Sequence, residues 1–244
     1  MKVHASSHLK IPTKDSVDTI ITILKDTYPN AHIVLQYNTQ WELLVAVILS
    51  AQCTDVLVNK VTRSLFKKYT TLDDYANADI REFENDIRST GFYHNKAKNI
   101  LASARKIKES FRGRVPATME EILTLPGVAR KTANVVLGNA YGVVVGIAVD
   151  THVLRLAQRL RLVDLGSIGG KKELVFRKGS ATVVDYKKDA DPVKIEQQLM
   201  GIVPKKDWFQ LTYLLIDHGR AVCKAQNPDC GRCVLGKLCP VARQ

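Results

Sequence analysis

Apolar side chains recur at helical spacing along most of the chain. Between residues 15 and 28 they fall three or four positions apart, and Asp15 or Ser16 is a candidate cap for that helix. Residues 41–49 are almost wholly apolar, which predicts a helix that is buried on most sides. Further helical patterns cover residues 59–69, 79–89, 96–114, 153–162, 192–202 and 208–217. The sequence therefore predicts an all-α fold.

Two segments depart from this pattern. Residues 166–191 are rich in glycine and lysine, and they contain Val175-Phe176 and Thr182-Val183-Val184 as strand-like fragments. We interpret them as an insertion that forms a hairpin, and a surface loop is its simplest role. Residues 1–14 are polar and irregular. Lys2, Lys10 and Lys14 could contact phosphate there, but a frayed tail is the interpretation we prefer.

Composition and charge narrow the class of partner. The 244 residues are 45% hydrophobic, enough for one large core or two smaller ones. A net charge of +12 and a pI near 9.5 point to a polyanion, and nucleic acid is the first candidate. Residues 96–114 carry seven Lys or Arg and one Glu, which suggests that this helix has a phosphate-facing edge, although a charged face is usually just solvated. An anionic membrane is the alternative, but the sequence has neither a basic helix with an aromatic face nor an apolar run of about 18 residues. Without a secretory leader pattern, we expect an intracellular protein.

The densest candidate chemistry lies in residues 125–137, which read LPGVARKTANVVL, followed by VDTHV at residues 149–153. Pro126-Gly127 predicts a tight turn between two helices, because proline fixes φ and glycine accepts positive φ. Orphan N–H groups of Gly127, Val128 and Ala129 could then grip a phosphate oxygen without reading a base. This is a helix-hairpin-helix pattern.

Lys131 falls in the first turn of the second helix. The helix dipole and the neighbouring Arg130 would both push its ammonium group toward the neutral, nucleophilic amine. Asp150 follows an apolar run and precedes a helical pattern, where a carboxylate could accept a proton or stabilise positive charge on a sugar. Taken singly, Lys131 is more often a solvated lysine and Asp150 a plain helix N-cap.

These two motifs together resemble the endonuclease III family of DNA glycosylases. In that family the lysine and aspartate of the pattern are the catalytic pair, which the resemblance carries over to Lys131 and Asp150. It implies that Gly127, Val128, Ala129 and Arg130 bind DNA through the hairpin.

Other stretches carry further parts of the resemblance. Ser50-Ala51-Gln52-Cys53-Thr54-Asp55 is similar to a family stretch whose glutamine reaches into the DNA helix, which implies that role for Gln52. Its alternative role is a capping or buried amide. The loop from Thr90 to Lys96 implies that Phe92 is a wedge in the opposite strand, although relatives often have leucine and Phe92 could instead lie in the core. His152 is placed near the DNA, with a local hydrogen bond as the alternative.

Four of the five cysteines lie in the last 22 residues, as Cys223, Cys230, Cys233 and Cys239. Such clustering is unlike a disulfide framework in an intracellular basic protein. Four thiolates could hold zinc or an iron-sulfur cluster, and spacing alone does not separate the two. The 6-2-5 spacing resembles the [4Fe-4S] loop of the same family, so the resemblance implies that cofactor.

The resemblance implies two helical lobes with the active site in the cleft between them. One is a six-helix module with the hairpin, residues 33–143, and the other is an iron-sulfur module, residues 1–32 and 144–244. It further implies a bifunctional DNA glycosylase and AP lyase of base excision repair, which removes oxidised pyrimidines from double-stranded DNA and cleaves abasic sites by β-elimination. We expect a monomer that does not bind membranes, cytoplasmic and nucleoid-associated if prokaryotic.

Two other functions stay open at this point. A monofunctional mismatch glycosylase of the same superfamily would share the fold, the cluster and Asp150, but such enzymes usually lack a lysine at the hairpin position. A non-catalytic DNA-binding or redox-sensing module would keep the hairpin and the cluster, yet would need neither Lys131 nor Asp150.

Overall fold

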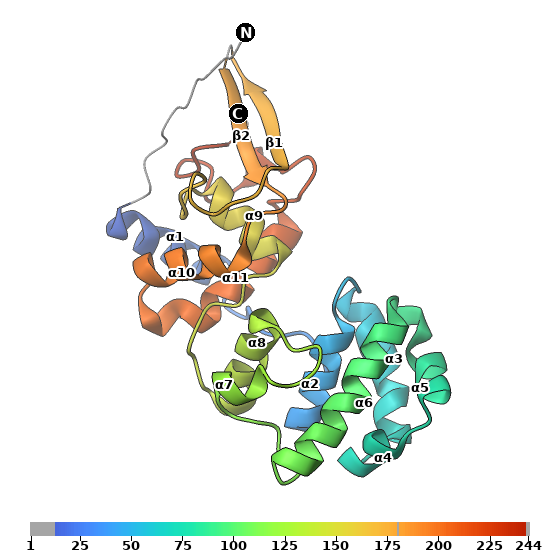
Figure 1. Ribbon diagram of the computed structural model, residues 1–244. Helices are drawn as coiled ribbons and strands as arrows, with labels where there is room; N and C mark the ends of the chain where they lie inside the picture. The colour runs from blue at the N-terminus through green and yellow to red at the C-terminus, as the bar shows by residue number, and fades with distance from the viewer. Residues whose placement is uncertain (1–12, 180, 243–244) are drawn as a thin grey trace. The chain divides into compact units, whose positions relative to one another are not determined.

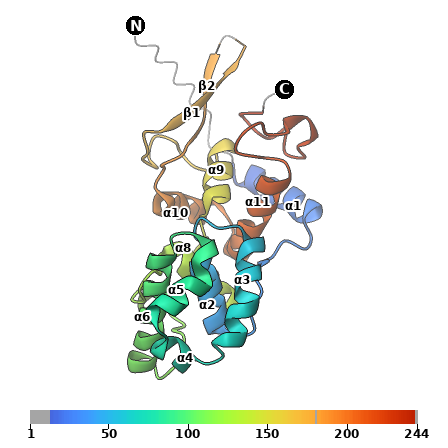
Figure 2. The same cartoon turned by 90° about the vertical axis from the view of Figure 1, so that its right-hand side faces the viewer.

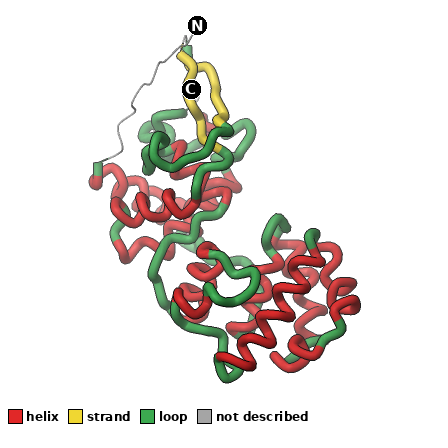
Figure 3. Tube along the Cα trace, viewed as in Figure 1, coloured by secondary structure: helices red, strands yellow, loops and turns green. Residues whose placement is uncertain are grey.

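The computed structural model describes residues 13–179 and 181–242. It divides into two compact units, Ile33–Val145 and the described parts of Met1–His32 and Gly146–Gln244. The first unit contains α2 (Gln40–Leu49), α3 (Asp55–Lys68), α4 (Leu72–Asn77), α5 (Ile80–Ile87), the 3-10 turn η1 (Arg88–Thr90), α6 (Tyr93–Ser110), α7 (Met119–Ile122) and α8 (Arg130–Tyr141). The second contains α1 (Lys14–Thr27), α9 (Thr151–Arg159), β1 (Glu173–Lys178), β2 (Ala181–Lys187), α10 (Pro192–Ile202), η2 (Lys205–Asp207), α11 (Trp208–Ala221) and η3 (Cys230–Arg232). The predicted all-α class is confirmed, as Figure 3 shows.

Helix α2 forms the centre of the unit Ile33–Val145 (Figure 1). Every residue from Leu43 to Leu49 is buried, as the continuous apolar run predicts, and the helix packs against α3, α6 and α8. Threonine or aspartate caps most of the surrounding helices. Helix α4 was not predicted, because the sequence around it reads as a polar connection. A capping box between Thr71 and Asp74 starts this six-residue helix, and Tyr75 anchors it in the core.

In the other unit, α1, α9, α10 and α11 enclose a second hydrophobic core (Figure 2). Leu24 and Leu156 are among the fully buried side chains that α1 and α9 contribute. The predicted cap of α1 is wrong by two or three positions: Thr13, not Asp15 or Ser16, accepts the first-turn N–H, from Ser16. Lys2 and Lys10 lie outside the described residues, whereas Lys14 is the first residue of α1.

The predicted hairpin of the insertion is confirmed. Strands β1 and β2 pair antiparallel, with Arg177 opposite Thr182 and a bulge between Leu174 and Val175. In both views the hairpin projects from the helices of its own unit (Figures 1 and 2). Its base is not the simple surface loop that we expected, because Asp185 is 2% exposed and packs into the unit.

The basic pattern of residues 96–114 belongs to a helix with other bounds. Helix α6 begins at Tyr93 and ends at Ser110, where Arg112 and Gly113 adopt left-handed φ values of 53° and 74° and turn the chain. Among the residues that the structure describes, every helix is too short or too polar to span a membrane.

Candidate active site and cysteine cluster

The hairpin between α7 and α8 needs glycine at position 127. Gly127 has a φ of 76°, and a Cβ atom there would lie 2.8 Å from the side chain of Asn99 on α6. Both the left-handed backbone and the close approach exclude a larger residue. The turn closes with a bond from Val128 N to Leu125 O of 3.2 Å, so the N–H of Val128 is used within the turn and is not one of the orphan donors predicted there.

Helix α6 also holds this turn through two side-chain hydrogen bonds. Ser103 Oγ donates to Pro126 O at 2.9 Å, and Lys106 Nζ donates to Thr124 O at 2.8 Å. Both carbonyls flank the glycine turn, so the hairpin is fixed to a long helix at two points. A loop held in this way presents its N–H groups with little ordering cost when an anion binds.

Lys131 is the second residue of α8 and is half-buried. The preceding N-cap is Ala129, which has no side-chain acceptor to satisfy the N–H groups of the first turn. These groups and the two basic residues Arg130 and Lys131 make this helix start a positive site. The predicted position of Lys131, in the first turn after the hairpin, is therefore what the structure shows.

Asp150 is the N-cap of α9. Its Oδ1 accepts from His152 N and Val153 N, both at 2.8 Å. Because both bonds end on Oδ1, capping uses only one of the two carboxylate oxygens. Asp150 is therefore the helix N-cap that the sequence offered as an alternative, and its second carboxylate oxygen takes no part in the cap.

His152 makes the local contact that the sequence left as its alternative role. Its Nδ1 lies 3.3 Å from Arg155 Nη2, and the Cβ of a larger residue at position 219 would lie 2.6 Å from that nitrogen. Gly219 therefore provides the room for the imidazole beside α9.

Gln52 and Phe92 share an uncommon backbone conformation. Gln52 has a φ of 52° and Phe92 a φ of 50°, both in the left-handed region that non-glycine residues rarely adopt. Both side chains are exposed, and Phe92 is 64% exposed, which excludes the core position considered for it. Strained backbone at two exposed side chains points to a function for both turns.

Lys96 links the two turns, although its place in a basic stretch predicted a phosphate-facing position. It is 4% exposed, and its Nζ donates to Leu49 O and to Thr90 O, both at 2.8 Å. Each carbonyl lies just before one of the strained turns. Burial holds the pKa of Lys96 below its usual value. Its spacing from Ile100 and Ile107, which continues the apolar stripe of α6, is the signal that reveals this burial in the sequence.

Other cations of α6 also have protein partners. Arg105 Nε donates to Ala76 O at 3.0 Å, and Lys108 pairs with Asp73 at 2.7 Å. Together with Lys96 and Lys106, these contacts show that much of the positive charge of this helix holds its own unit together. The predicted phosphate-facing edge is therefore smaller than the sequence count indicates.

All four C-terminal cysteines line one pocket, together with Arg159 and Asp185. Burial raises the pKa of the Cys239 thiol to about 11 and raises the pKa of Cys233 as well. Such thiols stay protonated at neutral pH unless a bound cation stabilises the thiolates. Within the part of the chain that is described, no three His, Cys, Asp or Glu side chains are close enough to hold a single metal ion. Four cysteine sulfurs around one pocket are the donor set of an iron-sulfur cluster.

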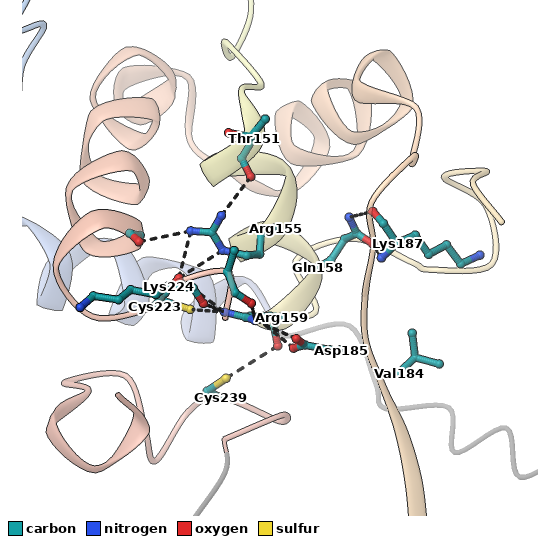
Figure 4. A network of polar contacts seen from close by, with 12 residues as sticks. Thr151, Arg155, Gln158, Arg159, Val184, Asp185, Lys187, Cys223, Lys224 and Cys239 are labelled. Carbon is teal, nitrogen blue, oxygen red and sulfur yellow. Dashed lines mark hydrogen bonds and ion pairs between the residues drawn. The ribbon is translucent and has the colours of Figure 1, made fainter. Parts of the chain in front are cut away.

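Two arginines of α9 reach the first of these cysteines (Figure 4). Arg155 donates to Cys223 O from Nε at 3.1 Å and from Nη2 at 3.0 Å. Arg159 Nη1 lies 3.3 Å from Cys223 Sγ and also donates to Lys224 O at 2.7 Å. No sequence motif predicted a function for either arginine. The helix that Asp150 caps is thus bonded directly to the start of the cysteine loop.

Comparison with known proteins agrees with this geometry. Residues 45–175 match the family described as HhH-GPD superfamily base excision DNA repair protein, and residues 223–242 match the iron-sulfur binding domain of endonuclease III. Endonuclease III of Synechocystis is 49% identical over 230 residues, 94% of each chain. Endonuclease III of Bacillus subtilis is 44% identical over 214 residues, 88% of this chain and 87% of the relative.

A solved structure leads to the same family. A trapped endonuclease III–DNA covalent intermediate with an estranged adenine shares 41% identity and a TM-score of 0.81, covering 94% of this chain and 96% of the other. Sequence and fold thus agree over nearly the whole length. The chain belongs to the endonuclease III family, the DNA glycosylases and AP lyases of base excision repair that carry a [4Fe-4S] cluster.

Proposed function

We propose that Lys131 is the nucleophile of this enzyme. The observation that carries the proposal is the position of Lys131 in an uncapped, positively charged helix start, directly after a hairpin suited to hold phosphate. A neutral Lys131 Nζ attacks C1′ of the damaged nucleotide, and the bond from C1′ to the base breaks with its electron pair. The base leaves with a proton, and the opened sugar forms a Schiff base with the lysine.

Asp150 is the acid-base partner in this proposal. Its carboxylate accepts a proton as Lys131 attacks and stabilises the positive charge that develops on the sugar as the base departs. Oδ2 is the oxygen available for this work, because Oδ1 holds the start of α9. The Schiff base makes the C2′ proton acidic, and its loss expels the 3′ phosphate by cleavage of the C3′–O bond.

DNA binding is assigned to three elements. Backbone N–H groups of Gly127 and Ala129, with Arg130, hold a phosphate beside the flipped nucleotide, and Val128, whose N–H closes the turn, completes the hairpin that approaches it. Gln52 fills the space that this nucleotide vacates, and Phe92 enters the opposite strand as a wedge. Their exposure and left-handed backbones support this assignment. His152 lies at the start of α9 and supports the position of Asp150.

Cys223, Cys230, Cys233 and Cys239 are the proposed ligands of the cluster, because all four line one pocket. Four thiolates around iron tie the C-terminal loop together and give it a redox-active centre. The residues of this chain supply the deprotonated sulfurs and, through Arg159, a hydrogen-bond donor to one of them.

The proposed substrate is duplex DNA with an oxidised pyrimidine or an abasic site. The enzyme acts as a monomer, which in a prokaryote is cytoplasmic and associated with the nucleoid. Residues 33–143 serve as the helix-hairpin-helix module and residues 1–32 with 144–244 as the cluster module. Lys131 belongs to the first module and Asp150 to the second.

A panel of duplexes tests the substrate class. Matched duplexes carry one oxidised pyrimidine, one oxidised purine, one mismatch or no lesion, and both base release and strand cleavage are measured. The proposal predicts release and cleavage on the oxidised pyrimidine, with Asp150→Asn strongly impaired in both. Release from a mismatch without cleavage would identify a monofunctional glycosylase instead. Binding without either product would identify a non-catalytic module.

A further inference from the structure

The inserted hairpin places a buried carboxylate beside the cysteine pocket. Asp185 on β2 and Arg159 on α9 form a two-point ion pair, with Nε to Oδ1 at 2.8 Å and Nη2 to Oδ2 at 2.7 Å. Both side chains are 3% exposed or less. A planar, bidentate pair of this kind is among the strongest charge-assisted contacts in proteins. It lies between the insertion and the body of the unit (Figure 4).

The opposite side of the same guanidinium faces the cysteine loop. Arg159 Nη1 contacts Cys223 Sγ at 3.3 Å and Lys224 O at 2.7 Å, and Nη2 donates to Ala225 O at 3.1 Å. Arg159 is therefore shared between the loop and the hairpin. A change in the charge of Asp185 is felt at the sulfur of Cys223 through a single rigid group.

The hairpin base is fixed so that Asp185 keeps this position. Gln158 Nε2 donates to Lys187 O at 3.1 Å, and Lys187 N donates to Gln158 Oε1 at 2.7 Å. Arg161 Nη1 donates to Asp185 O at 3.2 Å. Side chains of α9 and the residues after it thus hold the backbone on both sides of Asp185, which a tolerated surface loop does not require.

Charge determines what this arrangement does. A guanidinium hydrogen-bonded to a thiolate ligand favours the more reduced, more negative state of an iron-sulfur cluster. A buried carboxylate paired with that guanidinium opposes this effect. Loss of either partner leaves the other as a buried charge without its counter-ion, which is strongly destabilising.

We propose that Asp185 is a positioning and charge-balancing residue for the cluster, through which the inserted hairpin sets the reduction potential and the retention of the [4Fe-4S] group. This inference rests on the proposed assignment of Cys223 as a cluster ligand. It gives the insertion a specific role in this chain.

The test compares cluster-loaded wild type with Asp185→Asn, Arg159→Gln and Glu173→Gln by protein-film voltammetry. Asp185→Asn shifts the potential in the positive direction, because the guanidinium is no longer balanced. Arg159→Gln shifts it in the negative direction, because a cation and a thiolate hydrogen bond are lost. Glu173→Gln is the matched control: it removes a half-exposed carboxylate from the same hairpin and leaves the potential unchanged. Shifts of the same sign in the first two variants, or none, would overturn the proposal.

Retention of the cluster is the second readout. Visible absorbance is followed under a chelator, and Asp185→Asn loses it at least about tenfold faster than Glu173→Gln. The double variant Arg159→Gln/Asp185→Asn, which buries no unpaired charge, retains the cluster longer than Asp185→Asn alone. A double variant that loses the cluster no more slowly would contradict the ion-pair role, even if neither variant survives to voltammetry.

A cysteine variant distinguishes the proposed role of Asp185 from the assignment of Cys223 as a cluster ligand. Cys223→Ser is purified alongside, and its absorbance spectrum is recorded. A normal cluster in Cys223→Ser would remove Cys223 as a ligand and overturn both proposals. An altered or absent cluster in Cys223→Ser, together with an unchanged Asp185→Asn, would overturn only the role of the hairpin.

Discussion

The buried ammonium of Lys96 donates a 2.8 Å hydrogen bond to Thr90 O, one residue before the Gly91-Phe92 turn. A second bond of the same length reaches Leu49 O, just before the turn that carries Gln52. Lys96→Met fills the space but leaves both carbonyls without this donor, and should cost about 2 kcal/mol of unfolding free energy. Urea denaturation measures the loss. Lys98→Met, an exposed lysine on the same helix, is the control and should stay within about 0.5 kcal/mol of wild type.

The pH dependence of that difference has a defined sign. Burial keeps the pKa of Lys96 in the folded protein below the unfolded value of 10.5, so the unfolded chain binds more protons between the two values. The contribution of Lys96 to stability should therefore rise as pH increases toward 10.5, and fall as pH decreases through the folded pKa. Denaturation of wild type and Lys96→Met at several pH values tests this. A gap that shrinks with rising pH would show that burial does not control this lysine.

Two glycines with similar backbones should respond differently to alanine. Gly127 and Gly142 have φ values of 76° and 65°, but only at Gly127 would the new Cβ atom clash with Asn99. Gly142→Ala should cost about 1 kcal/mol from backbone strain alone, and Gly127→Ala about 2 kcal/mol more, with weaker DNA binding. Denaturation and a duplex-binding titration measure the two effects. Asn99→Gly also removes the Asn99 Cβ atom, which would lie 2.8 Å from the new Cβ, so adding it to Gly127→Ala should recover part of the loss relative to Asn99→Gly alone. No recovery would exclude the clash as its cause.

Phe92 should matter for activity and not for stability. Because the side chain is 64% exposed, Phe92→Ala should change unfolding free energy by less than about 0.5 kcal/mol. If it stacks in DNA, base release from duplex substrate should fall about tenfold to hundredfold. Phe92→Leu should retain most of the activity, since an apolar wedge remains. Equal activity in all three proteins would mean that Phe92 does not enter the duplex.

Sequence periodicity predicted most of the helices because their buried faces are continuous. The bounds of α10 are those predicted, and α2 begins one residue earlier than its apolar run. Helix α4 escaped prediction because six residues between polar caps carry too little periodicity, and its start depends on the capping box at Thr71. The hairpin of the insertion was predicted from two short strand-like fragments. The contacts that its base makes with α9 were not predicted.

The candidate site divides in the same way. The sequence motifs predicted Lys131 just after the glycine turn and Asp150 at the start of a helix, and the structure places both residues there. Their catalytic roles stay a prediction. The ion pair of Arg159 with Asp185 joins residues 26 positions apart and depends on how the hairpin docks. No local pattern predicts such a contact, because it is set by tertiary packing. The expectation that Lys96 faces phosphate was wrong. Lys96 lies among other basic residues in the sequence, but its spacing places it on the buried apolar face of α6.

Borohydride trapping tests whether Lys131 is the nucleophile. A duplex with one oxidised pyrimidine is incubated with wild type or with Lys131→Gln, and the Schiff base is reduced to a stable adduct. We expect a covalent protein–DNA band with wild type and none with Lys131→Gln, while both proteins bind the duplex. An adduct of equal yield with Lys131→Gln would show that another amine is the nucleophile and would contradict the assignment of Lys131.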